Sequence, residues 1–163
     1  MTLFSKIING DIPSYTIAES EKFYAFLDIF PLQKGHTLIV PKIEVDKIFD
    51  VPDTYLSELL IFAKPIAAAI EKSFPCNRVG MVTVGLEVPH AHLHLIPINA
   101  AADMEFSQPK LALSTEEFKA IQDLIISKSV EDGDIDSDNS HGYIKQLIQK
   151  DFLSHFPFRN LSK

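Results

Sequence analysis

Histidines alternate with small or aliphatic residues over positions 90–96, which read His-Ala-His-Leu-His-Leu-Ile. In a β-strand, a period of two sends alternate side chains to opposite faces. One face of such a strand carries His90, His92 and His94, and the other carries Ala and Leu side chains that can pack on a core. The pattern therefore predicts a strand over residues 90–97 with a row of imidazoles on one side.

Shorter hydrophobic runs bounded by turn residues predict the rest of a sheet. Further strands are expected over residues 15–18, 22–27, 36–40 and 79–84. The first two of these form a plausible hairpin. A short amphipathic helix is expected over residues 3–9, where an Asn-Gly pair ends it. A single helical turn is expected over residues 44–49.

Apolar residues at steps of three and four predict a long helix from residue 53 to about residue 74. Asp53 or Thr54 is expected to cap its first turn. The buried stripe is expected to include Leu60. Pro65 lies inside the stripe and removes a backbone donor, so we expect a kink there.

A second helix is expected after Ser114, because Ser114 and Glu117 have the spacing of a capping box. The elements together predict an α+β fold, with a mostly antiparallel sheet of about five strands, one long helix and a short N-terminal helix. We expect one catalytic domain over residues 1–130. Residues 131–163 are expected to form an acidic linker and a C-terminal extension of unknown role. A calcium loop is excluded there, because the Gly and Glu that such a loop requires are missing.

The composition of the chain argues against several classes of binding partner. The 163 residues carry a formal net charge of −7, which argues against a protein that binds nucleic acid through a basic face. The one cysteine excludes a disulfide within the chain, and no apolar run is long enough for a transmembrane helix. The first residues lack the continuous apolar stretch of a signal peptide. We therefore expect a cytoplasmic protein that binds neither nucleic acid nor a membrane.

The histidine row admits three interpretations. It could be a solvated polar face, although such faces usually carry Lys, Thr and Glu. It could bind a metal, but at about 3.3 Å per residue His90 and His94 lie roughly 13 Å apart along a strand, so all three histidines can hardly reach one ion. The third interpretation is nucleophilic attack at a phosphate, in which one neutral imidazole attacks and its neighbours donate hydrogen bonds to the phosphate oxygens.

The row His90 to Ile96 resembles the signature of the histidine triad (HIT) family, in which three histidines alternate with apolar residues. Upstream segments resemble family landmarks in the family order: Phe4-Ser5-Lys6-Ile7, Gly10-Asp11-Ile12-Pro13, Ala25-Phe26-Leu27-Asp28, Gly35-His36-Thr37-Leu38-Ile39-Val40-Pro41-Lys42 and Gly85-Leu86-Glu87-Val88-Pro89. The resemblance covers roughly residues 3–98. It implies a HIT-like fold and a homodimer.

The resemblance implies a role for each of four histidines. His92 matches the middle histidine of the motif, so it would attack the α-phosphorus of a nucleotide and form a nucleotidyl-histidine intermediate that water hydrolyses. His90 and His94 would hydrogen-bond the phosphate oxygens and fix the proton position on His92. His36 matches a fourth histidine that the family brings near the other three. The alternative is that the flanking histidines are purely structural.

The resemblance also implies nucleotide-binding positions. Asp28 matches an acidic residue that accepts hydrogen bonds from ribose hydroxyls, although an Asp after a strand is also a common turn residue. Four apolar side chains could line a base pocket or belong to the core: Phe4, Ile7, Leu27 and Ile29. Glu87 and Val88 belong to the loop before the triad. In that loop Leu86 and Glu87 depart from the family's usual Gln followed by Ser or Thr, which leaves the preferred leaving group open.

The expected function is cleavage of the α-phosphate bond of a purine nucleoside 5′-monophosphate conjugate of the adenosine phosphoramidate type. A dinucleoside polyphosphate hydrolase is the alternative within the family, and a nucleotide-binding regulatory protein with little turnover is the alternative outside enzymes. No cofactor is expected. Some family members hold a structural zinc ion through two cysteines and a histidine, but the matching positions here are Thr2, Ser5 and Ile43 or Glu44, so we expect no metal.

Overall fold

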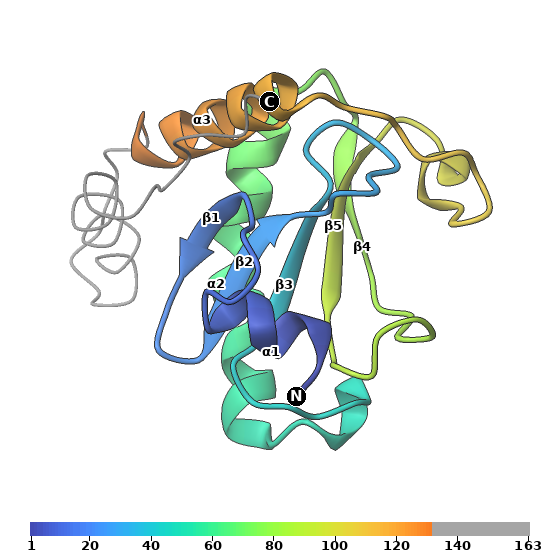
Figure 1. Cartoon of the computed structure of the whole chain (residues 1–163). Helices are drawn as coiled ribbons and strands as arrows, with labels where there is room; N and C mark the ends of the chain where they lie inside the picture. Colours follow the sequence, from blue (N-terminus) through green and yellow to red (C-terminus); the bar gives the residue numbers. More distant parts are fainter. Residues whose placement is uncertain (132–163) are drawn as a thin grey trace, which may run out of the picture.

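Five antiparallel strands form a single sheet in the computed structural model, which describes residues 1–131 (Figure 1). The strand order across the sheet is β1-β2-β3-β5-β4. The strands are β1 Thr16–Glu19, β2 Phe23–Leu27, β3 Thr37–Pro41, β4 Arg78–Val82 and β5 Leu93–Ile98. The helices are α1 Leu3–Ile8, α2 Asp53–Ser73 and α3 Thr115–Glu131, with 3-10 turns η1 Ile48–Asp50 and η2 Ala101–Met104. The predicted α+β class, the five strands, the long helix and the short N-terminal helix are confirmed.

Alternation along the strands separates two cores. On one face of the sheet, α2 and α3 pack on strand side chains that include Phe23, Ile39 and Leu93. On the other face, α1 packs through Phe4 and Ile7. The sheet residues under α1 are Tyr24, Phe26, Leu38 and Val40. Because the register places Leu38 opposite His94, the side chain of His94 emerges on the α1 face.

The long helix α2 runs through Pro65 without interruption. Its N-cap is Pro52, whose carbonyl accepts hydrogen bonds from the first-turn amides, so the expected Asp53 or Thr54 cap is wrong. Asp53 instead lies in the first turn, where its negative charge faces the positive end of the helix dipole. The buried stripe is Leu59, Ala63, Ile66, Ala69 and Ile70. Leu60 is 54% exposed, so its assignment to the stripe is also wrong.

The strand that carries the histidines is shorter than predicted. β5 begins at Leu93, whereas the sequence predicts a strand from residue 90. β3 pairs with β5 only as far as Leu93, and the Ala91 amide donates instead to the Val45 carbonyl. His90 and His92 therefore lie in the segment that leads into β5, and both are buried all the same.

The predicted capping box before α3 is confirmed. The Ser114 amide donates to the Glu117 carboxylate, and the Glu117 amide donates to the Ser114 hydroxyl. Among residues 1–131, no helix combines the length and the hydrophobicity that crossing a bilayer requires. Apart from Glu131 at the end of α3, the expected acidic linker and extension at 131–163 lie outside the described residues.

Candidate active site

The segment before β5 fixes the proton on His92. Nδ1 of His92 lies 2.6 Å from the backbone carbonyl oxygen of His90. A carbonyl can only accept, so Nδ1 carries the proton and donates it. In the neutral ring, Nε2 then holds a lone pair. His92 thus has the tautomer that a nucleophilic imidazole requires.

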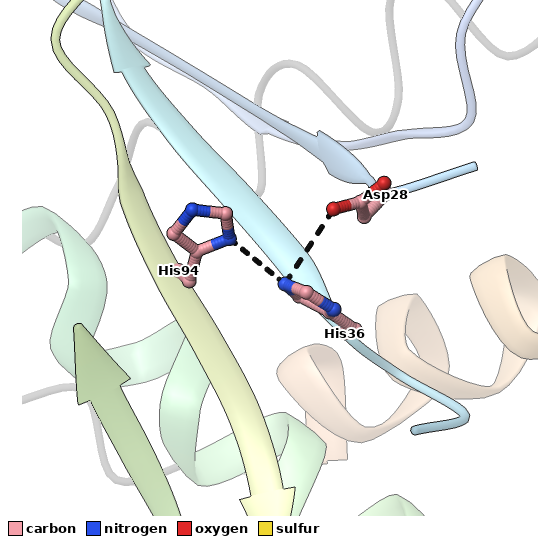
Figure 2. Close-up of side chains that lie close together, drawn as sticks. All are labelled: Asp28, His36 and His94. Carbon is pink, nitrogen blue, oxygen red and sulfur yellow. Dashed lines mark hydrogen bonds and ion pairs between the residues drawn. The ribbon is translucent and has the colours of Figure 1, made fainter. Parts of the chain in front are cut away.

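A second chain of hydrogen bonds fixes the protons on His36 and His94. The Leu32 amide donates to Nδ1 of His36 over 3.1 Å, so the His36 proton lies on Nε2. That Nε2–H donates to Nδ1 of His94 over 2.9 Å (Figure 2). His94 consequently keeps its own proton on Nε2. The chain ends in an N–H group that can donate to a phosphate oxygen.

Both histidines of this chain are neutral at physiological pH. Burial lowers the pKa of His36, and with smaller electrostatic contributions from Lys110 and His92 the pKa falls from 6.5 to about 3. Burial likewise lowers the pKa of His94 to about 3, with contributions from His36 and His92. Neutral rings agree with the hydrogen bonds, since a doubly protonated His36 could not accept from the Leu32 amide.

The position of His36 depends on the residue before it. Gly35 adopts a φ of +92°, which L side chains rarely tolerate. A Cβ atom on Gly35 would lie 2.5 Å from Cε2 of Phe74, at the end of α2. The turn that delivers His36 to the site therefore requires glycine.

Asp28 joins the histidines from the end of β2. Its Oδ2 lies 3.6 Å from Nε2 of His36 (Figure 2). Its Oδ1 accepts a hydrogen bond from the Phe30 amide at 2.8 Å. Burial raises the pKa of Asp28, and the Phe30 hydrogen bond and the charges of His92 and Lys110 oppose that rise. The carboxylate oxygens retain accepting capacity beside the histidine pair.

Asp28, His36 and His94 are also the one group of described residues that could hold a metal ion, with ligand atoms all within 4.8 Å of one another. A metal on Nε2 of His36 would displace the proton that His94 accepts. The neutral His36 ring would then carry its proton on Nδ1, facing the Leu32 amide, so that two donors would oppose each other. The hydrogen bonds favour a proton over a metal ion at this place.

His90 is held on both sides of its ring. Nε2–H donates to the Pro41 carbonyl oxygen at 2.8 Å, and Nδ1 lies 2.8 Å from the Thr2 hydroxyl. Since Nε2 carries the proton, Nδ1 accepts and the Thr2 hydroxyl donates. Both ring nitrogens of His90 are thus committed to the protein, which leaves the ring no free donor for a phosphate.

Two aromatic rings flank the histidines. The Phe4 ring meets His92 edge-on at 5.1 Å and His90 at 5.9 Å between ring centroids. The Phe106 ring meets His94 at 4.8 Å and His36 at 6.4 Å. Phe4 and Phe106 restrict the orientation of the imidazoles from opposite ends of the row.

The other predicted nucleotide-binding residues divide into three sets. Ile7 and Val88 belong to the core cluster of Phe4, on the same face as the histidines. Leu27 is separated from them, because its side chain lies in the core under α2 and α3. Ile29 and Glu87 are exposed in the loops that follow β2 and precede β5.

Several contributors were not singled out from the sequence. The Leu32 amide is a backbone group and carries no sequence signal. Phe106 and Lys110 lie in an irregular segment after η2, and the Leu111 amide ties that segment to the Pro31 carbonyl over 2.8 Å. An aromatic residue within this polar stretch is the only available hint to Phe106.

Comparisons with known proteins agree with this geometry. A family model described as the HIT domain matches residues 9–101. Adenosine 5′-monophosphoramidase HNT1 of Saccharomyces cerevisiae is 40% identical over 96 residues, which make up 58% of this chain but only 61% of that relative. The adenosine 5′-monophosphoramidase hnt1 of Schizosaccharomyces pombe is 35% identical over 129 residues, 77% of this chain and 96% of that one. A crystal structure of a Hit-like protein from Bartonella henselae superposes with a TM-score of 0.68 at 27% identity, covering 78% of this chain and 95% of the other.

Proposed function

This chain belongs to the histidine triad family, and on that premise we propose that it hydrolyses adenosine 5′-phosphoramidate-type conjugates through a nucleotidyl-histidine intermediate on His92. The observation that carries the proposal is the hydrogen bond from Nδ1 of His92 to the His90 carbonyl. It leaves the lone pair on Nε2, the nucleophilic atom of a ring whose centroid lies 4.9 Å from that of the His94 ring.

The reaction proceeds in two displacements. Nε2 of His92 forms a bond to the α-phosphorus as the phosphorus–nitrogen bond to the leaving amine breaks, and the departing amine takes a proton from water. The His90 carbonyl holds the Nδ1 proton of the resulting nucleotidyl-imidazolium. Water then attacks the same phosphorus and gives up a proton to solvent, which replaces the proton that the amine took. The phosphorus–Nε2 bond breaks, and the nucleoside monophosphate leaves with His92 neutral again.

His94 stabilises the charge that develops on the phosphate. Its Nε2–H is the terminal donor of the chain that starts at the Leu32 amide and runs through His36. Because both rings are buried and neutral, the donor is fixed in direction before substrate binds, which is the condition for electrostatic stabilisation of a transition state.

Asp28 and the apolar side chains near α1 bind the nucleoside. The oxygens of Asp28 accept hydrogen bonds from the ribose hydroxyls. Phe4, Ile7 and Val88 supply apolar surface for a purine base on the same face of the sheet. Leu27 has no part in this pocket, because its side chain lies beneath the helices on the opposite face.

Lys110 favours a second candidate activity, hydrolysis of dinucleoside polyphosphates. Its ammonium group lies 5.6 Å from the centre of the Phe106 ring, and that ring contacts His94. The positive charge of Lys110 is close enough to lower the pKa values of both Asp28 and His36. A cation at this place would attract a polyphosphate leaving group.

A turnover panel with wild type and His92→Ala tests the proposal. We expect wild type to hydrolyse adenosine or guanosine phosphoramidates, and we expect His92→Ala to lose at least about a thousandfold in kcat while it still binds AMP. Faster turnover of diadenosine polyphosphates would favour the second candidate. No turnover above background on any substrate, with AMP binding intact, would make the chain a nucleotide-binding regulatory protein instead.

The proposal includes a homodimer. β4 is an edge strand, so one row of its backbone groups has no partner within the sheet. Met81 in β4 and Val84 just after it are half exposed, which gives this edge an apolar surface for a second copy of the chain.

A further inference from the structure

We propose that Glu44 is a positioning residue for the nucleophile: it fastens the loop after β3 to α1, and this loop sets the direction of the carbonyl that orients His92. The inference rests on the proposed function. It concerns residues that do not touch the reacting atoms, and it follows from the donors and acceptors between the N-terminal segment, this loop and the start of the histidine row.

Glu44 joins the loop to the N-terminal helix. Its Oε2 accepts a hydrogen bond from the Thr2 amide at 2.9 Å and another from the Ser5 hydroxyl. Thr2 is the N-cap of α1, and its hydroxyl accepts from the Ser5 amide at 3.1 Å. These two hydrogen bonds, together with the Met1 ammonium group 3.2 Å from Oε1, lower the pKa of Glu44 to about 2, so the carboxylate is charged at every pH at which the protein would work.

Thr2 carries the connection onward to the histidine row. Its hydroxyl donates to Nδ1 of His90 at 2.8 Å, and Nε2–H of His90 donates to the Pro41 carbonyl at 2.8 Å. The His90 ring is 1% exposed, so loss of either partner would leave a buried nitrogen unsatisfied. The ring therefore anchors the backbone at residue 90 between α1 and the end of β3.

Val45, the residue after Glu44 in the loop, holds the peptide unit between residues 90 and 91. The Ala91 amide donates to the Val45 carbonyl at 2.6 Å. The carbonyl of the same peptide unit belongs to His90 and accepts the Nδ1 proton of His92. Because a trans peptide is planar, its N–H and C=O point in opposite directions, so the bond to Val45 directs the carbonyl toward His92.

Glu44 and Val45 therefore act together on one peptide plane. The Glu44 side chain fixes the loop against α1, and the Val45 carbonyl passes that position to the His90–Ala91 peptide. The same helix supplies Phe4, whose ring meets the His92 ring edge-on. Displacement of the loop would turn the carbonyl away from Nδ1, and His92 could then adopt the tautomer with its proton on Nε2, which cannot attack phosphorus.

Two pairs of variants test this positioning role. Glu44→Ala removes the acceptor, whereas Glu44→Gln keeps a side-chain oxygen that can accept both hydrogen bonds. Thr2→Val keeps the branched shape but removes the donor to His90, whereas Thr2→Ser keeps the hydroxyl. Glu58→Gln is the matched control, because Glu58 is an exposed carboxylate on α2 that pairs with Lys22, on the other side of the sheet.

The measurements are kcat and KM for adenosine phosphoramidate, AMP affinity by calorimetry, and the tautomer of His92 from nitrogen–proton correlation spectra of the imidazoles. We expect Glu44→Ala and Thr2→Val to lower kcat about three- to tenfold with AMP affinity unchanged. Their spectra should show a His92 ring protonated partly on Nε2. Glu44→Gln and Thr2→Ser should recover most of the kcat, and Glu58→Gln should match wild type.

Wild-type kcat and an unchanged His92 tautomer in folded Glu44→Ala or Thr2→Val would overturn the inference. Should Glu44→Ala fail to fold, Thr2→Val decides the question, because it alters no charge and little volume. The spectra also separate this inference from the proposed function. If wild type turns over no substrate, the proposed function fails, but a tautomer shift in the two variants would still establish the positioning role.

Discussion

At the scale of single residues, the proton positions on three histidines follow from their hydrogen-bond partners. The His90 carbonyl places a proton on Nδ1 of His92, and the Leu32 amide places one on Nε2 of His36 and hence on Nε2 of His94. The proposed nucleophile, His92, and the proposed phosphate donor, His94, thus have opposite tautomers. Backbone groups set the tautomers of His92 and His36 directly, and the His36 ring then sets the tautomer of His94.

The two buried histidines make stability depend on pH. The pKa of each falls from 6.5 in the unfolded chain to about 3 in the folded protein, so the unfolded state binds more protons between these values. Stability is then complete above about pH 6.5 and is lost as the pH falls toward 3. Between pH 7 and pH 5 we expect a loss on the order of 2 kcal/mol per histidine in the free energy of unfolding, measured by urea denaturation. The raised pKa of Asp28 acts in the opposite direction, at lower pH.

His36→Gln is the matched variant for this pH dependence. It removes one of the two titrating rings, so its stability should fall less steeply with acidification than that of wild type. Glu58→Gln, which alters an exposed carboxylate on α2, should show the same dependence of unfolding free energy on pH as wild type. If the free energy of unfolding falls equally steeply with acidification in His36→Gln and wild type, burial does not keep His36 neutral.

The sequence identifies which residues form the site better than it identifies the groups that those residues contact. The spacing of His90, His92 and His94 and the resemblance at Asp28 and His36 select the side chains that the structure brings together. Neither the spacing nor the resemblance indicates that the Leu27 side chain points away from the site, because both sides of β2 are buried. The contacts of Phe106 and Lys110 depend on how the segment after β5 folds back, which no local pattern encodes.

At the scale of elements, the N-terminus of α3 offers a direct test of a predicted cap. The Ser114 hydroxyl accepts from the Glu117 amide, and the Glu117 carboxylate accepts from the Ser114 amide. Ser114→Ala should lower the free energy of unfolding by about 1 kcal/mol, measured by urea denaturation. Since α3 packs on the face of the sheet opposite the histidines, the kcat of the variant should be unchanged. Ser127→Ala, an exposed hydroxyl late in the same helix, serves as a control.

Element boundaries depart from the sequence expectations where tertiary contacts compete with local patterns. The alternation of residues 90–96 is real, but the Ala91 amide binds the Val45 carbonyl, and the ladder with β3 stops at Leu93. Helical steps include Leu60 in the stripe of α2, yet its neighbour Leu59 is the residue that faces the sheet. Long periodic segments can be predicted from sequence, whereas their ends depend on which partner takes each amide.

At the scale of the whole molecule, the edge of the sheet determines the proposed assembly. We expect light scattering to give about twice the 18.3 kDa mass of one chain. Met81→Lys, which places a charge at the β4 edge, should give monomers. Leu60→Lys, an equally exposed position on α2, should leave the dimer intact. A wild-type protein that stays monomeric at all concentrations would contradict the assembly.

The proposed reaction requires a covalent bond between the nucleotide and His92. Rapid quenching of wild type during turnover of adenosine phosphoramidate, followed by mass spectrometry of the intact chain and of its peptides, measures that bond directly. We expect an added AMP group on the peptide that contains His92, localised to that ring and missing in His92→Ala. An adduct on another residue, or steady turnover with no adduct at any quench time, would contradict the proposed reaction.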